Sequence, residues 1–142
     1  MTSWVLVGAG AVVILDQATK SVAVRLLSPV GVAGARQSRV FKLAANEGSL
    51  LGRAPSVPAL LVLWTTTLMC TVLVLAAGAA SPSHRLAAAG LVVALGGATS
   101  NLLDRVGRGA VIDFIALGWW PTFNLADVAI VAGVLVAVGS VV

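Results

Sequence analysis

The chain has 142 residues, of which 59% are hydrophobic and only 10% are charged, and its net charge is +4. Its mean hydropathy of +1.05 is typical of a protein embedded in a bilayer. The pattern disfavours a water-soluble domain, because scarcely any apolar segment has the polar face that a surface helix requires. We therefore expect residues 1–142 to form one all-α membrane domain with four transmembrane helices, each of the roughly 20 apolar residues that a span requires.

The first predicted span, Trp4–Leu27, contains two charged residues, Asp16 and Lys20. These residues interrupt the run where a secretory signal stays apolar, and no basic segment precedes it, so we expect the span to be retained. Because the two residues are four apart, they share one face of the helix. They either neutralise each other as a structural ion pair or belong to an active site, and the sequence leaves both interpretations open.

The segment from about Ser28 to Val57 is the main predicted extramembrane piece, since it is rich in glycine and arginine. Within it, Arg39–Ala44 contains strand-forming residues, and the surrounding glycines suggest turns. This pattern predicts a small β element on the membrane surface.

The second predicted span, Pro58–Ala80, contains the one cysteine of the chain, Cys70, so no intrachain disulfide is possible. We expect Cys70 to be a small buried hydrophobic residue. The one histidine, His84, lies in the short predicted turn Ser81–Arg85. We expect it to be solvated, and we expect no zinc site, because no set of histidine and cysteine ligands accompanies it.

The third predicted span, Leu86–Leu103, has one narrow face of small residues that ends in polar residues. Along this face lie Ala87, Gly90, Ala94, Gly97, Asn101 and Asp104. Small residues let membrane helices approach closely, which explains the first four. Packing does not explain Asn101 and Asp104 with Arg105 beside them, so these three are candidate site residues.

The second predicted loop, Val106–Thr122, contains Asp113 and ends with the paired tryptophans Trp119 and Trp120. Paired tryptophans suit the headgroup interface of a membrane. We therefore expect this loop, and Asp113 with it, to lie at the membrane surface.

The fourth predicted span is Phe123–Val142, with the helix beginning near Thr122 or Phe123. Asp127 then lies about one to one and a half turns inside the helix and close to the membrane surface. Asn124 precedes Asp127 by three residues and shares its helical face. Its amide either orients the carboxylate or a substrate carbonyl, or it only caps the helix.

Asp113 and Asp127 are the most informative residues of the chain. A carboxylate in such an apolar chain is a candidate functional group. Two carboxylates close together can share one proton, since like charges at short range cannot both ionise, and such a pair can activate water for peptide hydrolysis. The residues therefore favour an intramembrane aspartic peptidase that needs no metal and no organic cofactor.

Two other classes of function remain open. A small transporter or channel could place Asp16, Asp104, Asp113 and Asp127 around a water-filled path, and it would show ion-dependent flux without proteolysis. A catalytically idle assembly factor is disfavoured, because a scaffold has no need for two costly acids.

Five short motifs, in order along the chain, resemble those of the bacterial lipoprotein signal peptidases, or signal peptidase II. They are Asp16–Lys20, Asn46–Gly48, Gly96–Ala98 with Asn101–Arg105, Gly109–Phe114 and Phe123–Asp127. Each motif is short, but all five in the family's order, distributed over four apolar spans, are hard to obtain by chance.

The resemblance implies a four-helix peptidase that removes the signal peptide from diacylglyceryl-modified prolipoproteins, cutting before the lipidated cysteine. It implies that Asp113 and Asp127 form the catalytic dyad, and it assigns substrate contacts or support of the site to Asp16, Lys20, Asn46, Asn101, Asp104 and Arg105. We expect membrane lipids and prolipoproteins as partners, no nucleic acid, and a monomer in the bacterial cell membrane. The active site and the β element of the first loop would lie near the extracytoplasmic face.

Departures from the family pattern and the charge distribution bear on these expectations. The family usually has glycine at the position of Ser100 and phenylalanine at the position of Leu51, and the chain is short at both ends, which leaves open a paralogue with a different membrane substrate. The expected topology places most loop arginines outside, opposite to the positive-inside rule. We favour the topology of the family, since exported prolipoproteins present their cleavage sites outside and the arginines could bind anionic headgroups.

Overall fold

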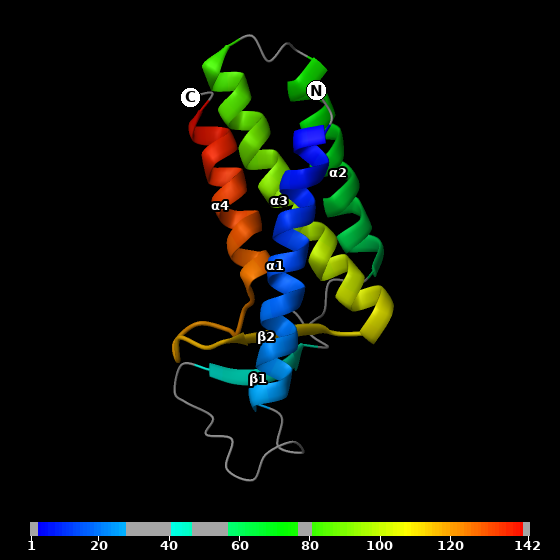
Figure 1. The fold of residues 1–142 in the computed structure, drawn as a ribbon, viewed down its shortest axis with the longest axis vertical. Coiled ribbons are helices and arrows are strands. Elements are labelled where there is room, and N and C mark those ends of the chain that lie inside the picture. Colours follow the sequence, from blue (N-terminus) through cyan, green and yellow to red (C-terminus); the bar gives the residue numbers. More distant parts are fainter. Residues whose placement is uncertain (1–2, 28–40, 47–56, 77–80, 141–142) are drawn as a thin grey trace.

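The protein folds into four helices and a two-stranded sheet at one end of the helices (Figure 1). This computed structural model describes residues 3–27, 41–46, 57–76 and 81–140. The elements, in chain order, are α1 (Ser3–Leu27), β1 (Phe41–Asn46), α2 (Val57–Ala76), α3 (Pro82–Arg108), β2 (Val111–Ile115) and α4 (Leu125–Gly139). The beginning of α1 and the end of α4 lie at the end of the molecule opposite to the sheet (Figure 1).

Each of the four predicted spans corresponds to a helix. Of the described helices, α1 and α3 are long and apolar enough to cross a membrane, while Leu61–Val74 within α2, and α4, are shorter apolar helices. The predicted second span was longer than α2, and its residues 77–80 lie outside the described part of the chain.

The third helix is longer at both ends than the hydropathy pattern predicted. The side chain of Ser81 accepts a hydrogen bond from the N–H of Ser83, and Pro82 occupies the first turn, where it needs no hydrogen-bond partner. The helix ends at Gly109, which has φ = 77° and donates its N–H to the carbonyl of Arg105. The prediction of a turn at His84 was therefore wrong, because this residue lies in the first turn of α3.

The last helix begins later than predicted. Asn124 is its N-cap, and the preceding residue, Phe123, forms an isolated antiparallel bridge with Ile115. Backbone pairing to β2 thus takes Phe123 out of the helix.

Helix α3 lies at the centre of the bundle and packs against the other three helices. A Cβ atom on Gly90 would lie 2.4 Å from the carbonyl oxygen of Gly133 in α4, and one on Gly97 would lie 2.5 Å from that of Ala126. On the side facing α1, a Cβ atom on Gly96 would lie 2.7 Å from the carbonyl oxygen of Ala9. The backbones therefore approach as closely as the face of small residues predicted.

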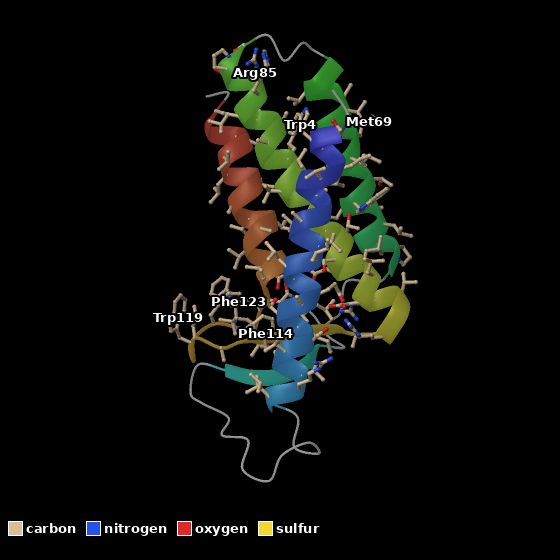
Figure 2. The ribbon with its side chains drawn as sticks, viewed as in Figure 1. Trp4, Met69, Arg85, Phe114, Trp119 and Phe123 are labelled. Carbon is tan, nitrogen blue, oxygen red and sulfur yellow. The ribbon has the colours of Figure 1, made fainter. Side chains whose placement is uncertain are left out.

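The outer faces of the helices are apolar, and their side chains point away from the bundle (Figure 2). Leu6 is 74% exposed and Leu135 is 66% exposed, for example. Cys70 is also exposed, so the expectation of a buried cysteine was wrong. Of the described elements α2 contacts only α3, so it buries one side, where Thr71 lies, and leaves Cys70 on the other.

The two strands form an antiparallel ladder that joins the first loop to the second. Ala44 lies opposite Asp113 and Asn46 lies opposite Val111, with an irregularity between Phe41 and Ala44. The predicted strand Arg39–Ala44 was displaced, and Arg39 lies outside the described residues. The sequence did not predict the partner strand β2. Asp113 therefore lies in a strand, where an irregular loop had been predicted.

Candidate active site

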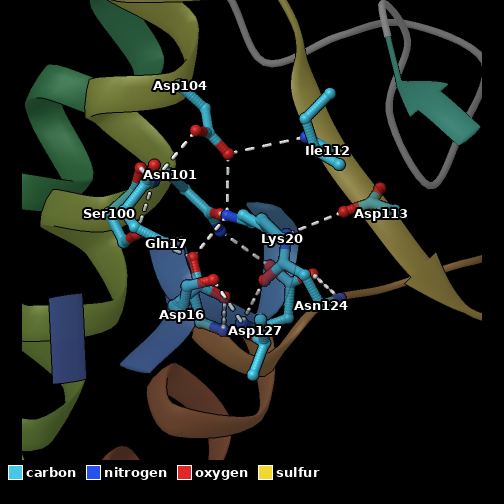
Figure 3. Close-up of polar contacts among 12 residues, drawn as sticks. Asp16, Gln17, Lys20, Ser100, Asn101, Asp104, Ile112, Asp113, Asn124 and Asp127 are labelled. Atoms are coloured by element: carbon cyan, nitrogen blue, oxygen red, sulfur yellow. Dashed lines mark hydrogen bonds and ion pairs between the residues drawn. The ribbon is translucent and has the colours of Figure 1, made fainter. Parts of the chain in front are cut away.

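Asp113 comes from β2 and Asp127 from the first turn of α4, at the end of the bundle near the sheet (Figure 3). The Ile115–Phe123 bridge folds the intervening segment back on itself, and Gly118, with φ = 83°, supplies the left-handed conformation that this turn needs. This fold-back brings the residue after Phe123 beside Asp113. The side-chain amide of Asn124 accordingly donates to Oδ1 of Asp113 at 2.7 Å.

Asn124 also caps α4. It therefore acts as a helix cap and also donates its side-chain amide to a carboxylate, that of Asp113. Its Oδ1 accepts from the N–H of Asp127 at 3.0 Å, and its own N–H donates to Oδ2 of Asp127 at 3.1 Å. This reciprocal pair is a capping box. Because Oδ1 is taken by the cap, the NH₂ group must point away from the helix, toward Asp113.

Asn101, on α3, holds the second aspartate. Its Nδ2 donates to Oδ1 of Asp127 at 2.8 Å, while its Oδ1 accepts from Asn124 at 3.1 Å and from Nζ of Lys20 at 3.0 Å. An ammonium group can only donate, so Lys20 fixes the amide with its oxygen inward and its NH₂ group toward Asp127. Two linked asparagines therefore present one donor to each aspartate.

The two aspartates differ in exposure. Asp113 is 4% exposed, whereas Asp127 is only partly buried. A carboxylate pair can divide acid and base roles when one member is protonated and the other ionised. The partly open position of Asp127 leaves one side of this pair reachable from outside the bundle.

An ionic cluster lies behind the asparagines. Lys20 is fully buried, and its Nζ lies 2.5 Å from Asp16 and 2.7 Å from Asp104. The predicted pairing of Asp16 with Lys20 is thus present, but it is shared with α3. A buried charge that lacked such partners would be strongly destabilising.

The carboxylates of this cluster also bind the backbone next to each candidate catalytic residue. Oδ1 of Asp16 accepts from the N–H of Ala126 at 2.8 Å, one residue before Asp127. Oδ2 of Asp104 lies 3.5 Å from the N–H of Ile112, one residue before Asp113. The supporting role expected for Asp16 and Asp104 has a structural basis in these contacts.

Three residues of the cluster were not predicted: Gln17, Ser100 and Arg108. Ser100 donates to Oδ2 of Asp16 at 2.7 Å, and Nε2 of Gln17 donates to Ser100 at 3.0 Å. Arg108 forms an ion pair with Asp104 and donates to Oε1 of Gln17 at 3.2 Å. The four-residue spacing on either side of Asp104 was a signal for Ser100 and Arg108.

For two other expected site residues, Arg105 and Asn46, the described structure gives other contacts. Nη1 of Arg105 lies 3.5 Å from the carbonyl of Gly109, and its buried Nε has no hydrogen-bond partner among the described residues. Asn46 pairs through its backbone with Val111, and its side chain lies outside the description. In the described ranges, no group of three or more histidine, cysteine or acidic residues could hold a metal ion.

The sequence matches one family over almost its whole length. The family described as Signal peptidase (SPase) II matches residues 8–142. The chain belongs to this family. The resemblance of its five motifs to those of signal peptidase II thus reflects membership of the family, and these motifs contribute Asp113, Asp127, Asn101 and Asn124 to one site (Figure 3).

Two curated relatives are lipoprotein signal peptidases. It is 37% identical over 139 residues to the lipoprotein signal peptidase of Mycolicibacterium smegmatis, covering 92% of this chain and 57% of that protein. It is 36% identical over 136 residues to that of Mycobacterium tuberculosis, covering 89% and 65%. The chain thus spans 57–65% of the length of these curated relatives.

Solved structures share the fold. One bacterial membrane enzyme superposes with a TM-score of 0.74 at 22% identity, covering 99% of this chain and 88% of that one. A second superposes with a TM-score of 0.70 at 20% identity, covering 100% and 94%. These similarities show that the signal peptidase II chain has the four-helix architecture of known membrane enzymes.

Proposed function

We propose that the protein is an aspartic endopeptidase that removes signal peptides from diacylglyceryl-modified prolipoproteins, cutting before the lipidated cysteine. Membership of the signal peptidase II family supports this activity. The single observation that carries it is the pair of linked asparagines, which present one amide donor to Asp113 and one to Asp127.

In this proposal, Asp113 and Asp127 share one proton. The ionised member takes a proton from water as the water oxygen bonds to the carbonyl carbon, and the protonated member donates to the carbonyl oxygen. The carbon–nitrogen bond of the tetrahedral intermediate then breaks. The member that took the proton from water gives it to the leaving nitrogen, and the other member takes a proton back from a hydroxyl of the intermediate as the carboxyl group forms. Both members act as one titrating unit, and no metal or organic cofactor takes part.

The proposed setting is a multi-pass monomer in the bacterial cell membrane, with residues 1–142 forming one domain. All four helices span the bilayer, and the sheet with the candidate site lies at the extracytoplasmic face. The apolar outer faces of the helices support this arrangement. A site at the membrane surface lets the acyl chains of the substrate stay in lipid while the scissile amide meets water.

The roles of the neighbouring residues belong to the same proposal. Asn101 and Asn124 orient the dyad, Asp16, Lys20 and Asp104 support it, and Arg105 with Asn46 contacts the substrate. The buried Nε of Arg105, which has no partner among the described residues, supports a ligand-binding role for its guanidinium.

The test is cleavage of a diacylglyceryl-modified prolipoprotein by purified protein in lipid. Asp113→Asn and Asp127→Asn should each lower the rate at least about 100- to 10,000-fold, the usual contribution of a general acid or base, and cooperative thermal unfolding of each variant checks that it is folded. Cys70→Ala, a change on an exposed face, is the control and should retain full activity. Full activity in either folded aspartate variant would refute the dyad.

The same experiment separates the alternatives. A folded native protein that fails on this substrate but cuts another membrane protein would indicate a paralogue. Ion flux in proteoliposomes without any proteolysis would indicate a transporter.

A further inference from the structure

The exposed charges of the described surface are all positive. Asp16, Asp104 and Asp113 are buried, and Asp127 is partly buried in the candidate site. Among the charged side chains whose burial is described, the exposed ones are those of Arg25, Arg85 and Arg108. The described surface therefore favours an anionic partner.

Two of these arginines line one groove. It has a volume of about 360 Å³ and lies where the ends of α1 and α3 meet β2. Its lining residues are Ser21, Val24, Arg25, Arg108 and Ile112. This volume falls within the range of about 300–1,000 Å³ typical of ligand pockets.

The two guanidinium groups are differently held. Arg108 is anchored by its ion pair with Asp104 and its hydrogen bond to Gln17, yet its side chain remains 45% exposed. A guanidinium has five N–H donors, so donors remain beyond these two contacts. Arg25, in the last turn of α1, forms no ion pair with any described residue. A phosphate group would complement both, because guanidinium binds phosphate through paired hydrogen bonds.

The position of the groove points to a phosphate in the headgroup layer. It lies at the same end of the molecule as Trp119, which is 79% exposed (Figure 2). Exposed tryptophans of membrane proteins gather at headgroup depth. Val24 and Ile112 give the groove an apolar part, which a free inorganic anion would not use and a lipid glycerol with its first methylenes would.

We propose that this groove binds one anionic phospholipid, with its phosphate between Arg25 and Arg108 and its glycerol region against Val24 and Ile112. The inference depends on the membrane location given in the proposed function but not on proteolysis. Ile112 precedes Asp113, so the lipid would contact the strand that carries one member of the candidate dyad.

The test measures lipid binding to the full chain by native mass spectrometry. Protein in neutral detergent is titrated with phosphatidylglycerol, and in parallel with phosphatidylcholine, and the complexes are then released from detergent in the spectrometer. Each titration is done with and without inorganic phosphate. Arg25→Gln should weaken the first phosphatidylglycerol bound about five-fold, since one basic residue near an anionic lipid surface contributes about 1 kcal/mol. Arg85→Gln, on an exposed arginine at the opposite end of α3, is the matched control and should bind like the native protein (Figure 2).

A second variant tests the groove without removing an arginine. Val24→Glu places a carboxylate beside Arg25, and it should weaken phosphatidylglycerol binding at least as much as Arg25→Gln. Unchanged binding in both variants, an equal loss in Arg85→Gln, or equal affinity for phosphatidylcholine would each overturn the proposal. Displacement of the lipid by inorganic phosphate would show that the groove is a site for free anions. Cross-linking of a signal peptide, and not of lipid, to a photoreactive group at position 24 would show that the groove binds peptide. Either result would overturn the proposal. None of these readouts depends on cleavage, so a failed lipid site and a failed peptidase assignment are distinguishable.

Discussion

The side chain of Asn124 performs two tasks, and each uses a different atom. Oδ1 caps α4, and Nδ2 donates to Asp113 and to Asn101. Asn101 likewise divides its amide between Lys20 and Asp127. Each amide is held in one orientation by a contact that needs its oxygen. The positions of the two amide donors at the dyad therefore depend on contacts that the amide oxygens make on the side away from the aspartates.

Replacing Asn124 with serine separates these tasks. Serine caps helices as well as asparagine does but has no amide to donate to Asp113. Asn124→Ser should keep the helix cap and lose about ten- to one-hundred-fold in cleavage rate, as expected for a lost hydrogen bond to a charged group, together with the stability that the two amide contacts contribute. Asn124→Ala also removes the cap, so it should lose activity and be about 1 kcal/mol less stable than the serine variant. Native activity in the serine variant would show that Asn124 acts only as a cap.

The sequence was sufficient to predict the residues whose type is unusual for their surroundings. Asp113, Asp127, Asn101 and Asp104 are costly in an apolar chain, and their presence alone marked them. Ser100 is common in helices and carried no such signal, although it is fully buried against Asp16. Its role depends on which helix packs against that face of α3, and the sequence alone does not specify this tertiary contact.

At the scale of the helices, the contact between α3 and α4 depends on missing side chains. An added methyl group on Gly90 would lie 2.4 Å from a carbonyl oxygen and 2.9 Å from the backbone nitrogen of Ala137. Backbone atoms cannot rotate away as a flexible side chain can, so the helices would have to separate.

Gly90→Ala should therefore destabilise the protein by about 1–3 kcal/mol, the usual cost of overpacking, despite the better helix propensity of alanine. Gly107→Ala is the control in the same helix, since nothing lies within 4 Å of a Cβ atom there. The control should be neutral or gain up to about 1 kcal/mol. Thermal unfolding in detergent measures both, and equal unfolding temperatures for the two variants would contradict close packing at Gly90.

Helix positions were easier to predict than strand positions. Apolar runs of spanning length and a three- and four-residue spacing of small residues identified all four helices and the packed face of α3. The second strand was missed, because Val111–Ile115 is short and its partner, Phe41–Asn46, is far away in the sequence. The ends of α3 were missed because a capping serine and a left-handed glycine, and not hydropathy, determine them.

At the scale of the molecule, one residue at each end of the bundle can report the orientation of the chain in the membrane. Ser83, in the first turn of α3, and Leu117, two residues after β2, are both exposed. The start of α3 and the sheet lie at opposite ends of the bundle (Figure 1). In a Cys70→Ala background, Leu117→Cys should react with an impermeant maleimide in intact spheroplasts. Ser83→Cys should react only after lysis, because the proposed topology places it in the cytoplasm.

The opposite labelling pattern would reverse the proposed topology and restore the positive-inside rule for this chain. Labelling of both positions in intact spheroplasts would show mixed insertion. The unsubstituted Cys70→Ala protein, which has no thiol, gives the background.

The contacts of Asp16 bear on how the protein is made. Asp16 and Lys20 lie one turn apart on α1, which is synthesised before α3 and α4, so they can neutralise each other before those helices are present. Their remaining contacts, to Asp104 and to the N–H of Ala126, become available only as the third and fourth helices follow. A chain interrupted before α4 also lacks Asp127. In the proposed peptidase the candidate dyad is therefore incomplete until α4 has been made, so a fragment that ends before α4 would not cut neighbouring proteins.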